Sequence, residues 1–440
     1  MEDQENGLQK ERSPKALSIE PGLSTAHTID QDPWIQVGLL LVTSFSCGYM
    51  LGYSNLILKP LGWTWGLIAM LIIGFLALYA NWLLAGFHVI DGQRFIRYRD
   101  MMGYLFGRRM YHITWSLQFL MFLLGNMGFI LLAGRSLKAI HAEFSLSTLR
   151  LQIYIIITGA IYFLFALMIP NMSAMRHWLG VSSVLTITYV VIVMAICVKD
   201  GKSSVSKSYA IEGSGTEKFF NAFNAFSAIL FADTSGMLPE IQATLRKPVV
   251  KNMRKALCMQ FTLGLAIYYA VTILGYWAYG SNVSEYLPNN FSGPKWAVIV
   301  ANATVFLQTI VSQHMFCTPV HEALDTRFLH LDQSMHSRDN IKILFVLRAG
   351  LFTLNTFMAA LIPFLGDFVN LIGSLSLFPL TFVFLSMIFL KVRGKTANSV
   401  VKAWHWINIV GFSVITILTT VAALRLIVEN AKAYRIFADN

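Results

Sequence analysis

One acidic residue, Asp233, lies near the middle of a long apolar run over residues 219–243. An ionisable side chain at membrane depth is costly and usually marks a functional site. Gly236 and Pro239 follow it, and a proline removes a backbone donor and clashes with the preceding helical turn. The run therefore predicts a helix that is interrupted just after Asp233. We expect its carboxylate to bind a substrate amino group, to carry a proton, or to cap the broken helix.

A second interruption is predicted in the apolar run over residues 34–57, where polar and small residues replace the aliphatic ones. Gly48 and Gly52 would allow the backbone to unwind and to approach a ligand closely. The N–H groups and the positive dipole end of the following half-helix could then hold a carboxylate. The same glycine spacing also fits simple close packing of helices. Expected substrate contacts at the two breaks are Ser46, Cys47, Gly48, Tyr49, Leu51, Gly52, Phe231, Asp233, Thr234, Ser235 and Gly236.

Other polar residues within apolar runs are weaker candidates. Asn126, between two glycines, is expected either to contact the substrate or to form an interhelical hydrogen bond. Gln308 and Ser312 are four residues apart and share one helical face, which could line the same cavity. His314 could relay protons, although a hydrogen-bonded core histidine is the commoner case. Glu240 is a further proton-coupling candidate, but a structural anchor or inner-gate role fits its position near several cations better.

The composition is that of a polytopic membrane protein. Apolar residues make up 55% of the 440 residues and charged residues only 13%, about half the share found in soluble domains. A spanning helix needs roughly 20 mostly apolar residues. Eleven segments meet this description: 34–57, 62–87, 111–140, 151–170, 177–198, 219–243, 253–279, 294–324, 342–362, 365–390 and 402–428.

The distribution of basic residues predicts the orientation. With the N-terminus in the cytoplasm, 22 of the 34 Lys and Arg residues fall on the inner side. We therefore expect a disordered cytoplasmic tail over 1–32, a membrane domain over 33–428 and an extracellular tail over 429–440. Membrane orientation explains the net charge of +11 better than binding to nucleic acid does.

Several kinds of chemistry lack support in this sequence. The four cysteines all fall inside apolar runs, so neither a disulfide nor a metal cluster is expected. No motif for nucleotide hydrolysis or for a common hydrolase is present. The stretch from His88 to Asp100 is expected to be an amphipathic interfacial segment. An enzyme is therefore not expected, and neither a cofactor nor a metal is needed.

Five stretches together resemble one family over nearly the whole chain. They are GYMLGYSNLILKPLGW from Gly48, YRDMMGYLFGRR from Tyr98, GFILLAGRSLKAI from Gly128, GMLPEIQATLRKPVVKNMRKAL from Gly236 and GYWAYGS from Gly275. With these stretches the chain resembles the plant proline (compatible-solute) transporters of the amino acid/auxin permease family. The resemblance implies a LeuT-like architecture, with inverted repeats of five helices over about 34–198 and 219–390 and an extra helix over 402–428.

The resemblance also implies a proton-coupled symporter in the plasma membrane. Proline, glycine betaine and γ-aminobutyrate are the implied substrates, and the two breaks would hold the carboxylate and the nitrogen. The family pattern has an aromatic residue followed by Asn-Thr-Gly where this chain has Asp233-Thr234-Ser235-Gly236, so the substrate preference is open. A broader neutral amino acid permease and a non-transporting amino acid receptor are the alternatives. The sequence does not predict an oligomeric state.

Overall fold

A computed structural model describes most of the chain. It covers residues 25, 29–45, 47–145, 147–169, 176–203, 207–234, 236–335 and 337–433. Most of the expected N-terminal tail, the last seven residues, and the candidate residues Ser46 and Ser235 lie outside the described residues.

The first half of the described chain is helical apart from one short hairpin. The elements are α1 (Trp34–Phe45), α2 (Met50–Tyr53), η1 (Ser54–Leu58), α3 (Lys59–Ala85), β1 (Val89–Ile90), β2 (Gln93–Arg94), α4 (Tyr98–Phe106), α5 (Arg108–Ala142), α6 (Leu151–Met168) and α7 (Arg176–Gly201). Gly62, inside α3, has φ +68° and ψ −175°, which kinks the chain between the first and second expected segments. A positive φ of this kind suits glycine because it has no Cβ.

The second half continues with helices and short helical turns. The elements are α8 (Gly215–Asp233), α9 (Leu238–Ala243), α10 (Val249–Met259), η3 (Gln260–Gly264), α11 (Leu265–Tyr279), η4 (Gly280–Asn282), η5 (Leu287–Asn290), α12 (Lys295–Phe328), α13 (Arg338–Leu361), α14 (Leu365–Leu371), η6 (Ile372–Leu377), η7 (Pro379–Val383), α15 (Phe384–Arg393) and α16 (Ser399–Ala433). Helix α16 continues past residue 428, so residues 429–433 are helical and not part of a tail.

The described residues form an all-α polytopic bundle, as the sequence predicts. Nine of its helices are long and apolar enough to cross a membrane. They match the expected segments two to five and seven to eleven. The remaining two expected segments are the interrupted ones: α1 is followed by α2 after a break, and α8 is followed by α9 after another.

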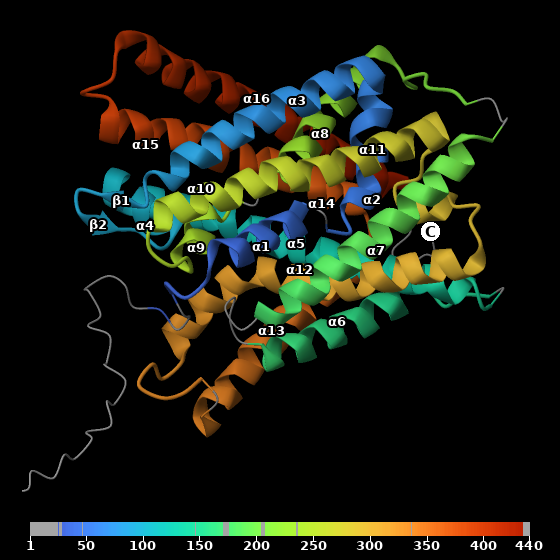
Figure 1. The fold of residues 1–440 in the computed structure, drawn as a ribbon, viewed down its shortest axis with the longest axis horizontal. Helices are drawn as coiled ribbons and strands as arrows, with labels where there is room; N and C mark the ends of the chain where they lie inside the picture. The colour runs from blue at the N-terminus through green and yellow to red at the C-terminus, as the bar shows by residue number, and fades with distance from the viewer. Residues whose placement is uncertain are drawn as a thin grey trace, which may run out of the picture.

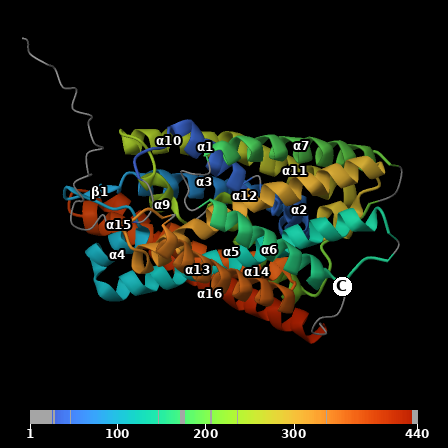
Figure 2. The ribbon, with the colours of Figure 1, turned by 90° about the horizontal axis from the view of Figure 1, so that it is seen from below.

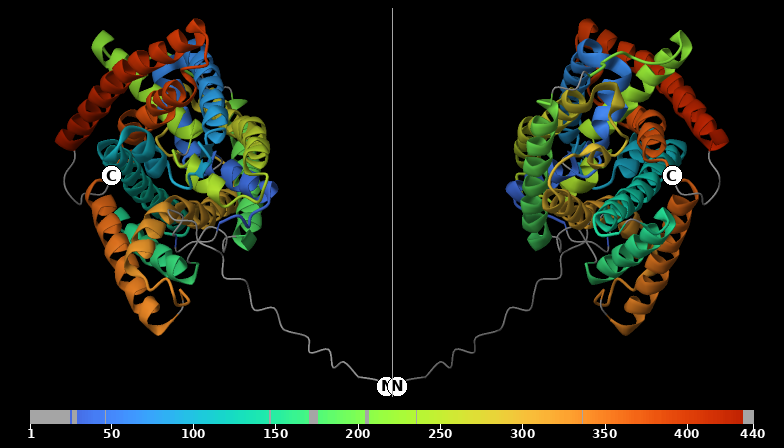
Figure 3. Two further views of the ribbon diagram at one scale, coloured as in Figure 1. Left: turned by 90° about the vertical axis from the view of Figure 1, so that its left-hand side faces the viewer. Right: turned by 90° about the vertical axis from the view of Figure 1, so that its right-hand side faces the viewer.

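The helices run roughly along the long axis of the molecule (Figure 1). The hairpin β1–β2, α4 and α9 lie together at one end, which we call the hairpin end. The turns η4 and η5 belong to the opposite end. Seen from below, the hairpin end again lies at one side of the molecule (Figure 2). Seen end-on, α6 and α13 pack on one flank while α16 lies on the other (Figures 1 and 3).

Two long helices form the centre of the bundle. Most of the apolar stretch of α5 and of α12 is buried inside the protein, whereas only a small part of that of α16 is. Helices α5 and α12 pack against each other, and both lie beside a break. Burial of this kind lets protein rather than lipid surround polar groups at membrane depth.

The chain that precedes α1 is bonded to the hairpin end. The N–H of Asp30 donates to the carbonyl of Ala243 (3.1 Å), and the N–H groups of Gln31 and Asp32 donate to that of Thr244 (both 2.8 Å). The N–H of Arg246 donates back to Asp32 (3.0 Å). Residues 30–32, expected to end a disordered tail, are therefore fixed because their backbone finds partners beyond α9.

A buried polar cluster fastens the same segment to the hairpin. The Arg94 guanidinium donates to both carboxylate oxygens of Asp30 (2.6 and 2.7 Å) and to His88 Nε2 (2.9 Å). His88 is therefore an acceptor at Nε2. Burial, together with the neighbouring Arg94 charge, lowers the pKa of His88 to about 4.

We expect His88 to make the protein less stable in acid. The unfolded chain takes up a proton at an ordinary histidine pKa near 6.5, whereas the folded chain resists it down to about pH 4. The contribution of His88 is therefore complete above about pH 6.5 and is lost as the pH falls. The stability lost at pH 5, relative to neutral pH, is about 2 kcal/mol.

Thermal unfolding of the detergent-purified protein at pH 7, 6 and 5 measures this loss. The His88→Asn variant should show a flatter pH dependence, whereas His112→Asn, at an exposed position, should behave like the wild type. Parallel pH curves for the wild type and His88→Asn would contradict the assignment.

Candidate functional site

The first break brings an aromatic side chain into the centre of the bundle. Tyr49, between α1 and α2, is buried and its hydroxyl donates to the carbonyl of Gly125 in α5 (3.0 Å). Its ring meets Phe129 of α5 and Phe231 of α8 edge to face, with centroids 4.7 and 5.0 Å apart. Edge-to-face contacts of this kind are favourable and directional. Tyr49 and Phe231 therefore connect the two interrupted segments.

The two glycines of the first break lie against other elements. A Cβ on Gly48 would come within 2.5 Å of the Leu132 side chain and 3.0 Å of Thr309. A Cβ on Gly52 would lie 3.1 Å from the carbonyl oxygen of Glu285, in the connection that follows η4. Both positions fit the close-packing alternative, because there is little room for a side chain. A role in substrate binding stays a prediction.

The backbone of the first break is partly closed by tight turns. The N–H groups of Met50, Leu51 and Gly52 donate to the carbonyls of Cys47, Gly48 and Tyr49 (2.9–3.1 Å). These three donors were expected to face a ligand, but their short-range bonds already satisfy them. Cys47 and Leu51 are both buried beside these turns.

The second break follows Asp233 directly. Helix α8 ends at Asp233, Thr234 has an extended backbone, and α9 begins at Leu238. Gly236 has φ +64°, and a Cβ there would lie 2.6 Å from the Met121 sulfur. The sequence prediction of an interruption at this point is confirmed. A larger residue at position 236 would meet both backbone strain and a clash.

The carboxylate of Asp233 is fully buried, and neither of its oxygens has a hydrogen-bond partner among the described residues. Gly74 of α3 leaves space for it, since a Cβ there would lie 3.6 Å from Asp233 Oδ2 and 2.9 Å from the Tyr269 hydroxyl. Tyr53, Tyr268 and Tyr269 are near enough to interact with it electrostatically. An ionised carboxylate left without a partner in such a place costs several kcal/mol.

The tyrosines near Asp233 form a compact group of rings. Tyr53 and Tyr268 meet edge to face with centroids 5.1 Å apart, and Tyr269 lies 4.9 Å from Tyr268. The Tyr269 hydroxyl donates to the carbonyl of Met70 (2.6 Å). The Tyr268 hydroxyl is buried and has no partner in the described part of the chain. The group therefore offers one uncommitted hydroxyl beside an uncommitted carboxylate.

The polar residues of α5 and α12 mostly bond to each other. Gln313 Nε2 donates to Asn126 Oδ1 (2.6 Å), which is the interhelical alternative considered for Asn126. Gln308 Nε2 donates to Ser312 Oγ (2.7 Å), so the expected shared face is present. The His314 ring is buried edge-on to Phe165 of α6. Substrate contact by these residues, and a relay at His314, stay predictions.

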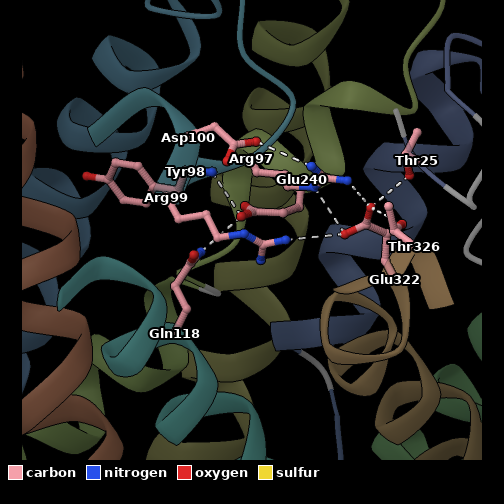
Figure 4. A network of polar contacts seen from close by, with 9 residues as sticks. All are labelled: Thr25, Arg97, Tyr98, Arg99, Asp100, Gln118, Glu240, Glu322 and Thr326. Atoms are coloured by element: carbon pink, nitrogen blue, oxygen red, sulfur yellow. Dashed lines mark hydrogen bonds and ion pairs between the residues drawn. The ribbon is translucent and has the colours of Figure 1, made fainter. Parts of the chain in front are cut away.

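Glu240 of α9 is held by neighbours at the hairpin end. Its Oε1 accepts from the Tyr98 N–H (3.0 Å) and from Gln118 Nε2 (3.1 Å) (Figure 4). The same Gln118 group donates to the carbonyl of Gly236 (3.1 Å), so it links α5 to the second break. These contacts fit the expected role of an anchor or inner-gate residue for Glu240.

An ion-pair network beside Glu240 joins three separate parts of the chain: Thr25, the segment 97–99, and α12 (Figure 4). Glu322 of α12 accepts from Arg97, from Thr25 (2.8 Å) and from Thr326 (3.1 Å), and it lies 3.6 Å from Arg99. Arg99 is almost fully buried, so residues 97–99 are not the interfacial stretch expected from sequence. They turn inward because Glu322 offers a buried counter-charge.

Charge balance in this network shifts the pKa of Arg97 and of Asp100. Burial opposes the charge of Arg97, but the hydrogen bond and attraction of Glu322, with Asp100 adding to them, raise its pKa. Burial raises the pKa of Asp100 even though Arg97 and Arg99 attract its charge. Arg97 therefore stays charged, and Glu322 is its main partner.

A smaller ion-pair cluster joins three parts of the chain at the opposite end of the bundle. Arg135 of α5 pairs with Glu285 (2.9 Å) and donates to the carbonyl of Pro363 (3.1 Å). The second oxygen of Glu285 accepts from the Gly366 N–H in α14 (2.8 Å). A cavity of about 500 Å³ opens beside this pair. Ion pairs thus join separate parts of the chain at both ends of the bundle.

Several of these residues were not identified from sequence. Arg97, Glu322 and Glu285 lie near helix ends or in connections, where charged residues are usually exposed. The tyrosines around Asp233 resemble the other aromatic residues of apolar segments and were not singled out. The sequence signal that could have identified two of them is that Tyr268 and Tyr269 are adjacent in one apolar segment.

Comparison with known proteins places this architecture in context. Residues 30–426 match the family model described as transmembrane amino acid transporter protein. GABA transporter 1 of Arabidopsis thaliana is 28% identical over 92% of this chain and 93% of its own length. Lysine histidine transporter-like 6 and lysine histidine transporter-like 1, both of Arabidopsis thaliana, are 26% and 24% identical over 94% and 87% of this chain, and over 92% and 85% of their own lengths.

We expect Gly128→Ala to disturb the centre of the bundle. The new Cβ would lie 1.8 Å from the Tyr49 hydroxyl, so the ring must leave its bond to Gly125 and its contacts with Phe129 and Phe231. Overpacking of this kind costs about 1–3 kcal/mol. Substrate uptake at matched surface expression should fall at least about tenfold, which corresponds to about 1.4 kcal/mol.

Two further variants make this measurement specific. Adding Tyr49→Phe to Gly128→Ala removes the closest atom and should restore part of the uptake. Gly411→Ala, where a Cβ would meet open space, should leave uptake unchanged. Normal uptake by Gly128→Ala would contradict the placement of Tyr49.

Proposed function

Because the chain belongs to the family of transmembrane amino acid transporter proteins, we propose that it is a proton-coupled symporter that imports a small zwitterion. The observation that carries the proposal is the buried, unpartnered carboxylate of Asp233 at the second helix break. Such a group needs either a proton or a cationic ligand, and an importer driven by protons supplies both.

The arrangement of the helices supports a LeuT-like inverted repeat. The two interrupted segments are the first and the sixth, which occupy equivalent positions in two repeats of five. The long buried helices α5 and α12 are the third and the eighth, again equivalent, and they pack against each other. Interrupted helices at matching positions are typical of secondary transporters that bind substrate near the membrane midplane.

We assign different tasks to the two breaks. The first break and its neighbours Tyr49, Phe129 and Phe231 would enclose the substrate. Asp233, which faces Tyr53, Tyr268 and Tyr269, would carry the coupling proton or bind the substrate nitrogen. One charge that crosses 100 mV gains about 2.3 kcal/mol, which is enough for roughly fifty-fold accumulation.

The substrate set follows from the family resemblance and the relatives. γ-Aminobutyrate, proline and glycine betaine are the first candidates, because each is a small zwitterion. Lysine and histidine come next, because related proteins carry those names. The plasma membrane is the proposed location, with the hairpin end in the cytoplasm. A broader neutral amino acid permease is the alternative, and the current measurements below distinguish it from a transporter of these substrates.

Substrate-evoked current in voltage-clamped oocytes tests the function. We expect γ-aminobutyrate, proline or glycine betaine to evoke inward current that is larger at pH 5.5 than at pH 7.5 and independent of sodium. Equal currents with many neutral amino acids would favour the broad permease. Binding without current or uptake, at normal surface expression, would instead favour a receptor and overturn the proposal.

A carboxylate substitution tests the role of Asp233. Asp233→Asn cannot exchange a proton, so the pH dependence of uptake should disappear and the maximal rate should fall by at least about tenfold. Asp367→Asn is the matched control, because Asp367 is also buried but is already held by Asn430 (2.9 and 3.1 Å). Unchanged affinity and pH dependence in Asp233→Asn would remove this residue from the site.

A further inference from the structure

A large basic groove lies at the hairpin end, away from both helix breaks. It has a volume of about 1020 Å³ and is bounded by the end of α3, the hairpin and the start of α10. Figures 1 and 2 show α10 lying beside α1 and α3 near this end. Its cationic lining residues are Arg94, Lys247, Lys251, Arg254 and Lys255.

The charges of this groove are not balanced by the protein. Asp30 is the carboxylate in the lining, and Arg94 already binds both of its oxygens. Lys247, Lys251, Arg254 and Lys255 form no ion pair within the described part of the chain. Lys251 and Lys255 are four residues apart on α10, a spacing at which like charges repel and destabilise a helix. An anion bound between them would remove this repulsion.

The cations are held in place by aromatic rings instead. The Arg254 guanidinium lies 5.0 Å from the ring centre of Trp82, and Lys255 Nζ lies 5.5 Å from that of Trp34. Arg254 Nε is buried and has no hydrogen-bond acceptor in the described residues. A positioned guanidinium with a free donor is suited to a phosphate oxygen.

Exposed apolar side chains lie beside the groove, on helices long and apolar enough to cross a membrane. Trp82 and Tyr79 of α3 are 37% and 39% exposed, and Leu263 of η3 is 49% exposed. Cys258 lines the groove and is also exposed. On the opposite face of α10, Met253, Ala256 and Leu257 are buried against the bundle. The basic face of α10 therefore lies at the boundary between water and the apolar layer.

We propose that this groove binds the phosphate-bearing headgroup of an anionic membrane lipid. The headgroup lies among Lys251, Arg254 and Lys255, and the acyl chains run over the exposed side chains of α3 and η3. A lipid fits better than a free phosphate, because exposed apolar side chains of α3 and η3 lie beside the basic residues. Basic pockets of this kind on the cytoplasmic side of membrane proteins are suited to anionic headgroups.

Binding of a fluorescent phosphatidylinositol 4-phosphate to the full-length protein in phosphatidylcholine nanodiscs tests the proposal. Lys251→Gln with Lys255→Gln should weaken binding about thirtyfold, which corresponds to about 1 kcal/mol for each lysine near a membrane surface. Lys391→Gln with Lys395→Gln removes the same charge from exposed positions in another loop and should change binding less than twofold. An equal loss in both double variants would overturn the proposal.

Labelling of Cys258 gives a second measurement. The other three cysteines, Cys47, Cys197 and Cys317, are buried, so a polar maleimide reports on Cys258. Its labelling rate should fall several-fold when the nanodiscs contain phosphatidylinositol 4-phosphate, and Lys251→Gln with Lys255→Gln should abolish this protection. Inorganic phosphate at millimolar concentration should not protect. Protection by phosphate alone, or none by the lipid, would overturn the proposal.

Discussion

An unpaired backbone N–H or C=O group inside the apolar layer of a membrane costs several kcal/mol. This constraint determines where the chain can leave the helical conformation. Both breaks lie beside α5, whose apolar stretch is largely buried, and each is hydrogen-bonded to it: the Tyr49 hydroxyl of the first break donates to the carbonyl of Gly125 in α5, and Gln118 of α5 donates to the carbonyl of Gly236 in the second break. The long central helices are therefore what makes two broken segments tolerable, and the outer helices protect them from lipid.

The sequence predicted the segments and their interruptions well, because each leaves a local signal. Gly236, Pro239 and a lone Asp233 in an apolar run mark the second break without any knowledge of neighbours. Family membership is confirmed at the level of amino acid transporters, whereas the proline subgroup stays an expectation. The direction in which each side chain points had no such signal. Whether Asp233 faces the first break or the tyrosines of α11 depends on the rotation of whole helices, which packing at a distance decides.

The charged networks at the two ends could not be predicted for the same reason, because they depend on how distant segments pack. Arg97 and Glu322 are 225 residues apart in the sequence, Arg135 and Glu285 are 150 apart, and Glu285 and Gly366 are 81 apart, so only the fold brings these partners together. Partly buried ion pairs give back much of their attraction as lost hydration. Exchange of such pairs for water therefore changes the free energy little.

The backbone pairing of residues 30–32 with residues 243–246 has a consequence for how the protein is made. Arg246 and Gln31 are 215 positions apart, so ribosomal synthesis must pass the sixth segment before the chain start can complete its hydrogen bonds. Until then the first segment has a break after Phe45 and lacks the hydrogen bonds that hold the residues before its start. An early insertion intermediate therefore depends on the translocation machinery, or on its own aliphatic half over Trp34–Phe45, to stay in place.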